Sequence, residues 1–321
     1  MRIFVAGATG VIGRRLVPLL VGNGHTVVGT TRAAHKADTL WAAGASAVVL
    51  DALDRDAVRE AIARAGPDVV VHQLTALAAF TDFRKFDESF AVTNRLRTQG
   101  TDNLIAGMRE AGVRRLVAQS FAGLTFARVG GTVKTEDDPL DPDPPEGLRR
   151  TIEAIRYLEN AVLHTAGIEG TVLRYGSFYG PGTSLGEGGF LLEGVRHRRF
   201  PIVGAGTGLT SFIHVDDAAS ATVAAIETGT LGLYNIADDD PAPVAEWVPA
   251  LAAATGAKPP RRVPPWLARR FVGEHGVVIM TEARGASNAK AKRDLGWRPT
   301  YPSWRDGFRR GLGGAAPTKA A

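Results

Sequence analysis

Three glycines near the start of the chain, Gly7, Gly10 and Gly13, have the spacing and the setting needed to hold a phosphate. An apolar run, residues 3–6, precedes them, and an apolar helical pattern follows at once. Gly7 permits a tight turn, Gly10 lets the backbone approach the phosphates, and Gly13 lets the helix pack closely on the strand. The N–H groups at a helix start attract a pyrophosphate. We therefore predict a dinucleotide site made by Gly7, Thr9, Gly10, Val11, Ile12 and Gly13.

The end of the second expected strand, residues 26–29, bears on the choice of dinucleotide. An acidic residue at this place would accept hydrogen bonds from the adenosine ribose and favour NAD. This chain continues instead with Thr30, Thr31 and Arg32. Arg32 is a permanently charged, planar donor that suits a 2′-phosphate, and Thr31 offers a hydroxyl. We predict NADP, with NAD as the alternative; an exposed arginine in a basic loop is the other interpretation of Arg32.

Residues after the third and fourth expected strands complete the predicted cofactor site. Asp51 is placed to meet the adenine amino group, beside Ala52, or it caps the next helix; the sequence leaves both interpretations open. Leu74 and Thr75 follow the strand at residues 69–72 and should line the nicotinamide side.

The elements that would position these residues alternate between strand and helix over the first half of the chain. Short apolar strands are expected at 3–6, 26–29, 47–50, 69–72, 115–118 and 170–174, with helices at 11–22, 36–43, 55–65, 86–111 and 149–166. Continuous apolar strands joined by helices indicate a parallel sheet covered on both faces. We predict an α/β fold: a Rossmann-type doubly wound parallel sheet with a small C-terminal substrate lobe. The expected division is 1–170 for the cofactor domain, 171–312 for the lobe with returning sheet elements, and 313–321 for a disordered tail.

Composition excludes several classes of function. The chain has 321 residues, of which 45% are hydrophobic and 22% charged, as in ordinary globular enzymes. It has no cysteine, which excludes disulfides and thiolate chemistry. We expect no membrane span, no signal peptide and a cytoplasmic protein. The net charge of +5 is scattered, so no nucleic-acid partner is expected, and no ligand spacing suggests a metal.

Beyond the glycine turn, several segments resemble extended short-chain dehydrogenases, the NAD-dependent epimerase/dehydratase family. These segments are 68–77 (DVVVHQLTAL), 173–182 (LRYGSFYGPG), 211–218 (SFIHVDDA), 233–237 (LYNIA) and 287–299 (SNAKAKRDLGWRP). The resemblance implies a nicotinamide cofactor passing the 173–182 segment, with Tyr175 and Phe178 in contact. It also implies a small-molecule substrate and a homodimer formed through the helices near 86–111 and 149–166.

The chain departs from this family where catalysis is concerned. Members usually carry Tyr-x-x-x-Lys on the helix after the fifth strand, and the matching positions here are Thr151 and Ile155. No lysine occurs between Lys134 and Lys258, so the pair is absent. The family's catalytic hydroxyl aligns with Phe121, one position after Ser120. We take Ser120 and Tyr175 as candidate catalytic hydroxyls.

We predict an NADPH-dependent reductase of a small apolar carbonyl metabolite that uses a non-standard proton donor. A substrate with a stabilised product, or a proton relayed by water, would dispense with the tyrosine–lysine pair. The alternatives are a sugar-nucleotide epimerase or dehydratase and a non-catalytic NADP-binding redox sensor.

Overall fold

A seven-stranded parallel sheet forms the centre of the computed structural model, which describes residues 1–77 and 83–313. The strand order is β12-β7-β5-β4-β1-β2-β3, and every neighbouring pair is parallel. The order reverses beside β1, and this is the place where α/β sheets bind ligands. The strands are β1 (Arg2–Ala6), β2 (Thr26–Thr31), β3 (Ser46–Val49), β4 (Val69–His72), β5 (Arg115–Phe121), β7 (Glu169–Tyr175) and β12 (Gly232–Ile236).

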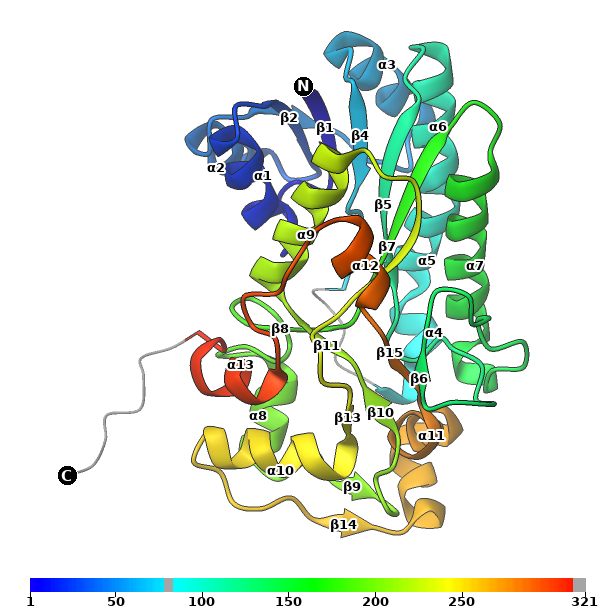
Figure 1. The fold of residues 1–321 in the computed structure, drawn as a ribbon, viewed down its shortest axis with the longest axis vertical. Helices are drawn as coiled ribbons and strands as arrows, with labels where there is room; N and C mark the ends of the chain where they lie inside the picture. The colour runs from blue at the N-terminus through cyan, green and yellow to red at the C-terminus, as the bar shows by residue number, and fades with distance from the viewer. Residues whose placement is uncertain (78–82, 314–321) are drawn as a thin grey trace, which may run out of the picture.

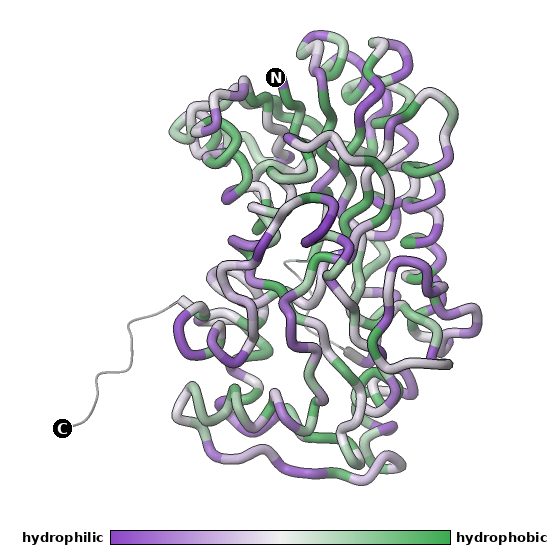
Figure 2. Tube along the Cα trace, viewed as in Figure 1, coloured by the Kyte–Doolittle hydropathy of each residue, from purple (hydrophilic) through white to green (hydrophobic). Residues whose placement is uncertain are grey.

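Helices cover both faces of this sheet (Figure 1). One face packs against α1 (Gly13–Gly22), α2 (Ala37–Ala42), α9 (Val215–Thr228) and α12 (Ala289–Asp294). The other packs against α3 (Arg55–Ala65), α6 (Thr101–Glu110) and α7 (Arg149–His164). Alternate residues of each strand face opposite layers, which explains why the strands are apolar throughout. Figure 2 shows these hydrophobic stretches along the central strands. The doubly wound α/β fold predicted from the sequence is therefore confirmed.

A second apolar core lies in the lobe below the sheet in Figure 1. Its helices are α8 (Phe190–Arg196), α10 (Val244–Ala254), α11 (Pro265–Glu282) and α13 (Trp304–Arg310). Its strands are short: β8 (Ser177–Tyr179), β9 (Ile202–Val203), β10 (Leu209–Thr210), β11 (Phe212–His214), β13 (Ala242–Pro243) and β14 (Arg262–Val263). β12 leaves this region and joins the main sheet next to β7. The proposed boundary at residue 170 stays a prediction, and residues 314–321 of the predicted tail lie outside the described residues.

The segment 86–111, expected as one helix, is divided in the structure. It forms α4 (Phe86–Ser89), α5 (Ala91–Arg95), a π-helical turn at Leu96–Gly100 and then α6. A π turn adds a residue to the helical turn and is often found at functional sites. The segment between β5 and α7 contains β6 (Val133–Lys134), which pairs with β15 (Gly285–Ala286).

None of the helices in the described part of the chain combines the length and the apolar character that a membrane span needs. Among residues 1–77 and 83–313, no group of three or more His, Cys, Asp or Glu could hold a metal ion.

Candidate functional site

The glycine turn follows β1 at the edge where the strand order reverses. Gly7 has φ +90°, and a Cβ on it would lie 2.5 Å from the carbonyl oxygen of Gln73. A Cβ on Gly13 would lie 2.4 Å from the Ala8 oxygen, so glycine is required where α1 meets the turn. Gly10 is exposed, and its Cβ would meet only the Gly7 oxygen, at 3.2 Å.

The start of α1 has no side-chain cap; the N–H groups of Arg14 and Arg15 donate to the carbonyls of Gly10 and Ile12, so the N–H groups before them are the ones that can meet a ligand. An open Gly10 beside an uncapped helix start fits a pyrophosphate. Within the turn, Thr9 and the buried Ile12 anchor the backbone: Thr9 donates from Oγ1 to Thr31 Oγ1 at 3.1 Å, and Ile12 packs in the sheet core. Val11 is half-buried between them.

At the end of β2, Arg32 is exposed, and its guanidinium has no hydrogen bond or ion pair with a described residue. A free, permanently charged fork at this end of the sheet fits a 2′-phosphate.

After β3, the Asp51 carboxylate accepts from the backbone N–H of Leu53 at 3.0 Å, while Asp54 caps α3. The interpretation of Asp51 as the helix cap was therefore wrong. Ala52 is buried, and its carbonyl accepts from Asn103 at 3.0 Å.

The end of β4 leads into a buried hydrogen-bond chain that includes Tyr175. Gln73 donates from Nε2 to Tyr175 Oη at 3.2 Å, and Tyr175 Oη lies 2.7 Å from Thr222 Oγ1. Because Thr222 donates to the Ala218 carbonyl, Tyr175 must donate to Thr222. Tyr175 is fully buried, and burial raises its pKa to about 12. Its hydroxyl proton is thus held inside the core.

The other predicted residues on the nicotinamide side surround this chain. Phe178 lies on β8 with its ring 5.5 Å from the Tyr175 ring. Leu74 is half-buried, and its N–H donates to His72 Nδ1 at 3.2 Å. Thr75 follows it and is also half-buried. Leu74 and Thr75 follow β4 and Phe178 follows β7, so all three lie just beyond the carboxyl ends of neighbouring parts of the sheet.

Ser120, at the end of β5, donates its hydroxyl to Glu159 Oε1 of α7 at 2.6 Å. The same carboxylate accepts two bonds from Arg174 of β7, at 2.7 and 2.6 Å. All three residues are at most 5% exposed. Because the proton of Ser120 is committed to a carboxylate, its Oγ can only offer lone pairs to a ligand.

Thr151 and Ile155, at the positions of the missing pair, lie in different surroundings. Thr151 donates from Oγ1 to Asp87 Oδ1 at 2.6 Å and accepts from Asn94 Nδ2 at 3.1 Å. Ile155 is 1% exposed, in an apolar cluster with Phe86, Leu140, Leu148 and Ile152, against which Phe90, Phe121, Leu124 and Ile279 pack. This cluster would not tolerate an ammonium group.

Sequence reasoning did not find Asp87, Asn94, Arg97 or Glu159. Asp87 accepts from the N–H groups of Arg150 and Thr151 and so caps α7 across 63 residues of sequence, a distance no local spacing reveals. Arg174 did carry a signal, since a charged residue inside an apolar strand requires a buried partner.

Other polar residues around the sheet have structural partners. His214 caps α9 through Nδ1, which accepts from the Asp216 N–H, and its Nε2 lies 2.9 Å from the Gly311 oxygen. Of the two aspartates that follow it, Asp216 pairs with Arg15, and Asp217 accepts from two backbone N–H groups. Tyr157 donates to Asp102 on the surface.

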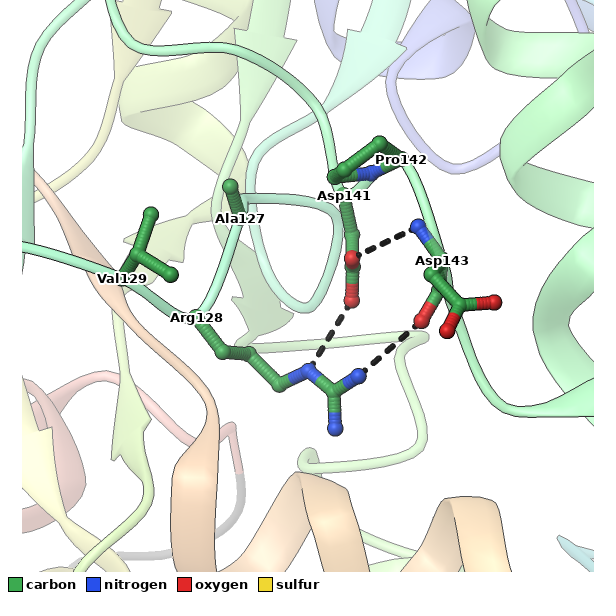
Figure 3. A pocket seen from close by; sticks show the side chains of 6 residues that line it. All are labelled: Ala127, Arg128, Val129, Asp141, Pro142 and Asp143. Atoms are coloured by element: carbon green, nitrogen blue, oxygen red, sulfur yellow. Dashed lines mark hydrogen bonds and ion pairs between the residues drawn. The ribbon is translucent and has the colours of Figure 1, made fainter.

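A surface hollow of about 260 Å³ near Arg128 is lined by none of the predicted site residues (Figure 3). Arg128 bonds the Asp141 carboxylate and the Asp143 carbonyl, each at 3.0 Å, and its third nitrogen bonds Glu282. With all three nitrogens engaged, Arg128 offers a ligand no free charge.

Comparison with known proteins agrees with this geometry. The model of the "NAD dependent epimerase/dehydratase family" matches residues 3–237. The chain is 47% identical over 311 residues to a 3-diazoavenalumate denitrifying reductase from a Streptomyces species, covering 97% of this chain and all of the relative. A Stigmatella aurantiaca ketoreductase of a farnesyl-substituted dihydroquinoline oxide is 27% identical and covers 96% of each chain. In structure the chain resembles Thermus thermophilus UDP-glucose 4-epimerase with NAD (TM-score 0.74, 24% identity, covering 97% of this chain and 98% of that one). It also resembles a human epimerase family protein with NADPH (TM-score 0.73, 20% identity, 96% and 98%).

Proposed function

The chain belongs to the NAD dependent epimerase/dehydratase family and is an NAD(P)-dependent oxidoreductase; we propose that it uses NADPH to replace the diazo group of a small carboxylic acid by hydrogen. The relative that is 47% identical over its whole length carries a name that states such a denitrifying reduction. The geometry of the site supports the same reaction class.

The observation that carries this proposal is the direction of three hydroxyl hydrogen bonds. Ser120 donates to Glu159, Thr151 donates to Asp87, and Tyr175 donates to Thr222. Reduction of a carbonyl leaves an alkoxide that needs a proton, which a positioned side chain normally supplies. Each hydroxyl considered for that task already gives its proton to the protein.

A diazo substrate removes this requirement. With the group in its diazonium form, the hydride that reduced nicotinamide supplies would form the new carbon–hydrogen bond, and the electron pair of the breaking carbon–nitrogen bond would leave with neutral dinitrogen. No alkoxide forms, so no proton donor is needed at the reacting carbon. The lone pairs of Ser120 and Thr151 suit the electron-poor carbon and nitrogen of a diazo group better than a protonated donor would.

The cofactor would be held by the residues predicted for it. The pyrophosphate fits the turn of Gly7, Thr9, Gly10, Val11, Ile12 and Gly13, and Arg32 with Thr31 would bind the 2′-phosphate of NADP. Asp51 and Ala52 would border the adenine, and Leu74, Thr75 and Phe178 the nicotinamide. In this proposal Tyr175 supports the nicotinamide side from within the core.

Reduction of a carbonyl, as predicted from the sequence, is the second candidate. It is favoured by a ketoreductase and by a 2-alkyl-3-oxoalkanoate reductase, 27% and 28% identical to this chain. In that case water would have to relay the proton.

The test is an assay of NADPH oxidation with 3-diazoavenalumate, with the product identified by mass spectrometry. We expect release of dinitrogen and, with deuterated NADPH, deuterium on the carbon that carried the diazo group. Oxidation of NADPH by a 2-alkyl-3-oxoalkanoate but not by the diazo acid would favour the second candidate. Tight NADPH binding with no turnover of either substrate would favour the redox sensor, and interconversion of UDP-sugars would favour an epimerase.

A further inference from the structure

Arg97 is a buried cation beside the proposed site that the proposed reaction does not use. It lies on the π-helical turn at Leu96–Gly100 between α5 and α6 and is 6% exposed. Its guanidinium carbon lies 5.8 Å from the centre of the Phe90 ring. Burial lowers the pKa of Arg97 to about 10, which still leaves it charged at neutral pH.

The guanidinium of Arg97 makes a single hydrogen bond with the described residues. Its Nη1 donates to Asn94 Oδ1 at 3.1 Å, and the same asparagine donates from Nδ2 to Thr151. No described residue accepts from Nε or Nη2. The guanidinium is therefore oriented by Asn94 next to Thr151, with donors left for a ligand.

The charges around Arg97 do not balance within the protein. Glu159 is the acidic group that acts on it, but this carboxylate already binds Arg174 twice and Ser120 once. Burial lowers the pKa of the nearby His72 to about 4, so that His72 is neutral. Asp87 is occupied by the start of α7 and by Thr151. Two buried arginines thus share one carboxylate, and an uncompensated buried charge is costly unless an anion pairs with it.

The location separates this anion from the cofactor phosphates. The glycine turn follows β1, and its helix α1 covers one face of the sheet. Arg97 acts electrostatically on His72 of β4 and Glu159 of α7, and the neighbouring Leu96 packs on the face covered by α3, α6 and α7. It is also near Thr151, where the substrate end of the site is expected.

We propose that Arg97 binds the carboxylate of the substrate, an inference that rests on the proposed reduction of a diazo acid. Asn94 fixes the guanidinium so that its two remaining nitrogens form a fork, the geometry that suits a carboxylate. Arg97 would then orient the acid relative to Ser120 and Thr151 and would select against neutral analogues.

The test is calorimetric binding of avenalumate, the acid left after loss of nitrogen, and of its methyl ester to the protein saturated with NADP⁺. We expect the wild type to bind the acid roughly ten- to a hundredfold more tightly than the ester. Arg97→Gln should abolish this preference, and Arg97→Lys should retain part of it. The control is Arg95→Gln, an exposed arginine two residues earlier at the end of α5, which should leave the preference unchanged.

Affinity for NADP⁺ should stay within about twofold in both Arg97 variants if the anion belongs to the substrate. A wild type that does not prefer the acid, an Arg97→Gln variant with the full preference, or a selective loss of NADP⁺ affinity would each overturn the inference. The wild-type comparison holds even if Arg97→Gln does not fold. The binding test needs no turnover, so it is independent of the proposed reaction. If the protein does not reduce the diazo acid but still prefers the acid over the ester in a way that depends on Arg97, only the proposed function is overturned.

Discussion

Ser120 and Glu159 are joined by a 2.6 Å hydrogen bond in which the serine is the donor. The same carboxylate accepts two further bonds from Arg174, so three donors converge on Glu159. Ser120 could otherwise donate to a substrate oxygen and polarise it. With its proton given to Glu159, its hydroxyl can only accept hydrogen bonds from a ligand. The site is consequently organised by a buried ion pair rather than by a proton-delivering pair.

Removing one partner of this ion pair should be strongly destabilising. Glu159→Gln leaves Arg174 buried and without its counter-charge, and breaking such a pair costs about 3–5 kcal/mol of the free energy of unfolding. Urea unfolding would measure this loss. The matched control is Arg114→Ala, which removes an ion pair with Glu169 whose arginine is 67% exposed, and it should cost at most about 1 kcal/mol. Similar losses in the two variants would contradict a special role for the buried pair.

Restoring a lysine at position 155 should not restore the family's usual chemistry. Ile155→Lys places an ammonium in a cluster of isoleucine, leucine and phenylalanine side chains, and we expect a loss of several kcal/mol in the free energy of unfolding. Thermal and urea unfolding would show it. Glu153→Lys, exposed on the same helix, should be nearly neutral. A stable Ile155→Lys protein that reduces ketones faster than the wild type would show that the cluster accommodates the missing lysine.

Local patterns predicted the parts of this molecule that depend on neighbours in sequence. The glycine turn and the parallel strands follow from short apolar runs and glycine spacing, and the structure places them as expected. The partners of Ser120 could not be predicted because Glu159 and Arg174 are 39 and 54 residues away from it. The break at Leu96–Gly100 was missed because a π turn interrupts the helical period without a proline or a glycine pair to mark it. Asp51 was wrongly considered as the cap of the next helix: Asp54, three residues later, has the same side chain and caps α3.

Arg32→Ala tests the preference for NADP. Loss of a charged contact to the 2′-phosphate should weaken NADPH binding by roughly 1.5–3 kcal/mol and leave NADH binding almost unchanged. Fluorescence titration with both cofactors would measure the two affinities. Equal losses for NADPH and NADH would mean that Arg32 does not contact the 2′-phosphate.

Tyr175→Phe tests whether the buried tyrosine takes part in proton transfer. The change leaves Gln73 without its acceptor in the core, so we expect a loss of about 1–3 kcal/mol of stability. Turnover at saturating substrate should keep the same pH profile, because the hydroxyl proton is directed to Thr222. Tyr157→Phe, 44% exposed, should change neither quantity appreciably. A pH profile that shifts in Tyr175→Phe alone would assign the proton donor to Tyr175.

The stability of the protein should fall as pH rises from about 6.5 to 8, because of Asp238. This side chain is 1% exposed, its Oδ2 has no hydrogen-bond partner, and burial raises its pKa to about 8. In the unfolded chain the pKa of aspartate is about 3.9, so between the two values the folded state holds a proton that the unfolded state has lost. The free energy of unfolding therefore decreases with pH through this window.

His72 changes the free energy of unfolding in the opposite direction, and it does so at lower pH. Burial lowers its pKa to about 4, so it adds stability as pH rises from about 4 to 6.5 and is constant above that. Of these two groups, only Asp238 should change the free energy of unfolding above pH 6.5. The expected loss is about 2 kcal/mol over 1.5 pH units. Urea unfolding of Asp238→Asn at pH 6.5 and 8 should show this dependence removed, since an amide does not ionise. Asp56→Asn, an exposed carboxylate, should keep the wild-type slope; a slope that survives in Asp238→Asn would show that another group titrates.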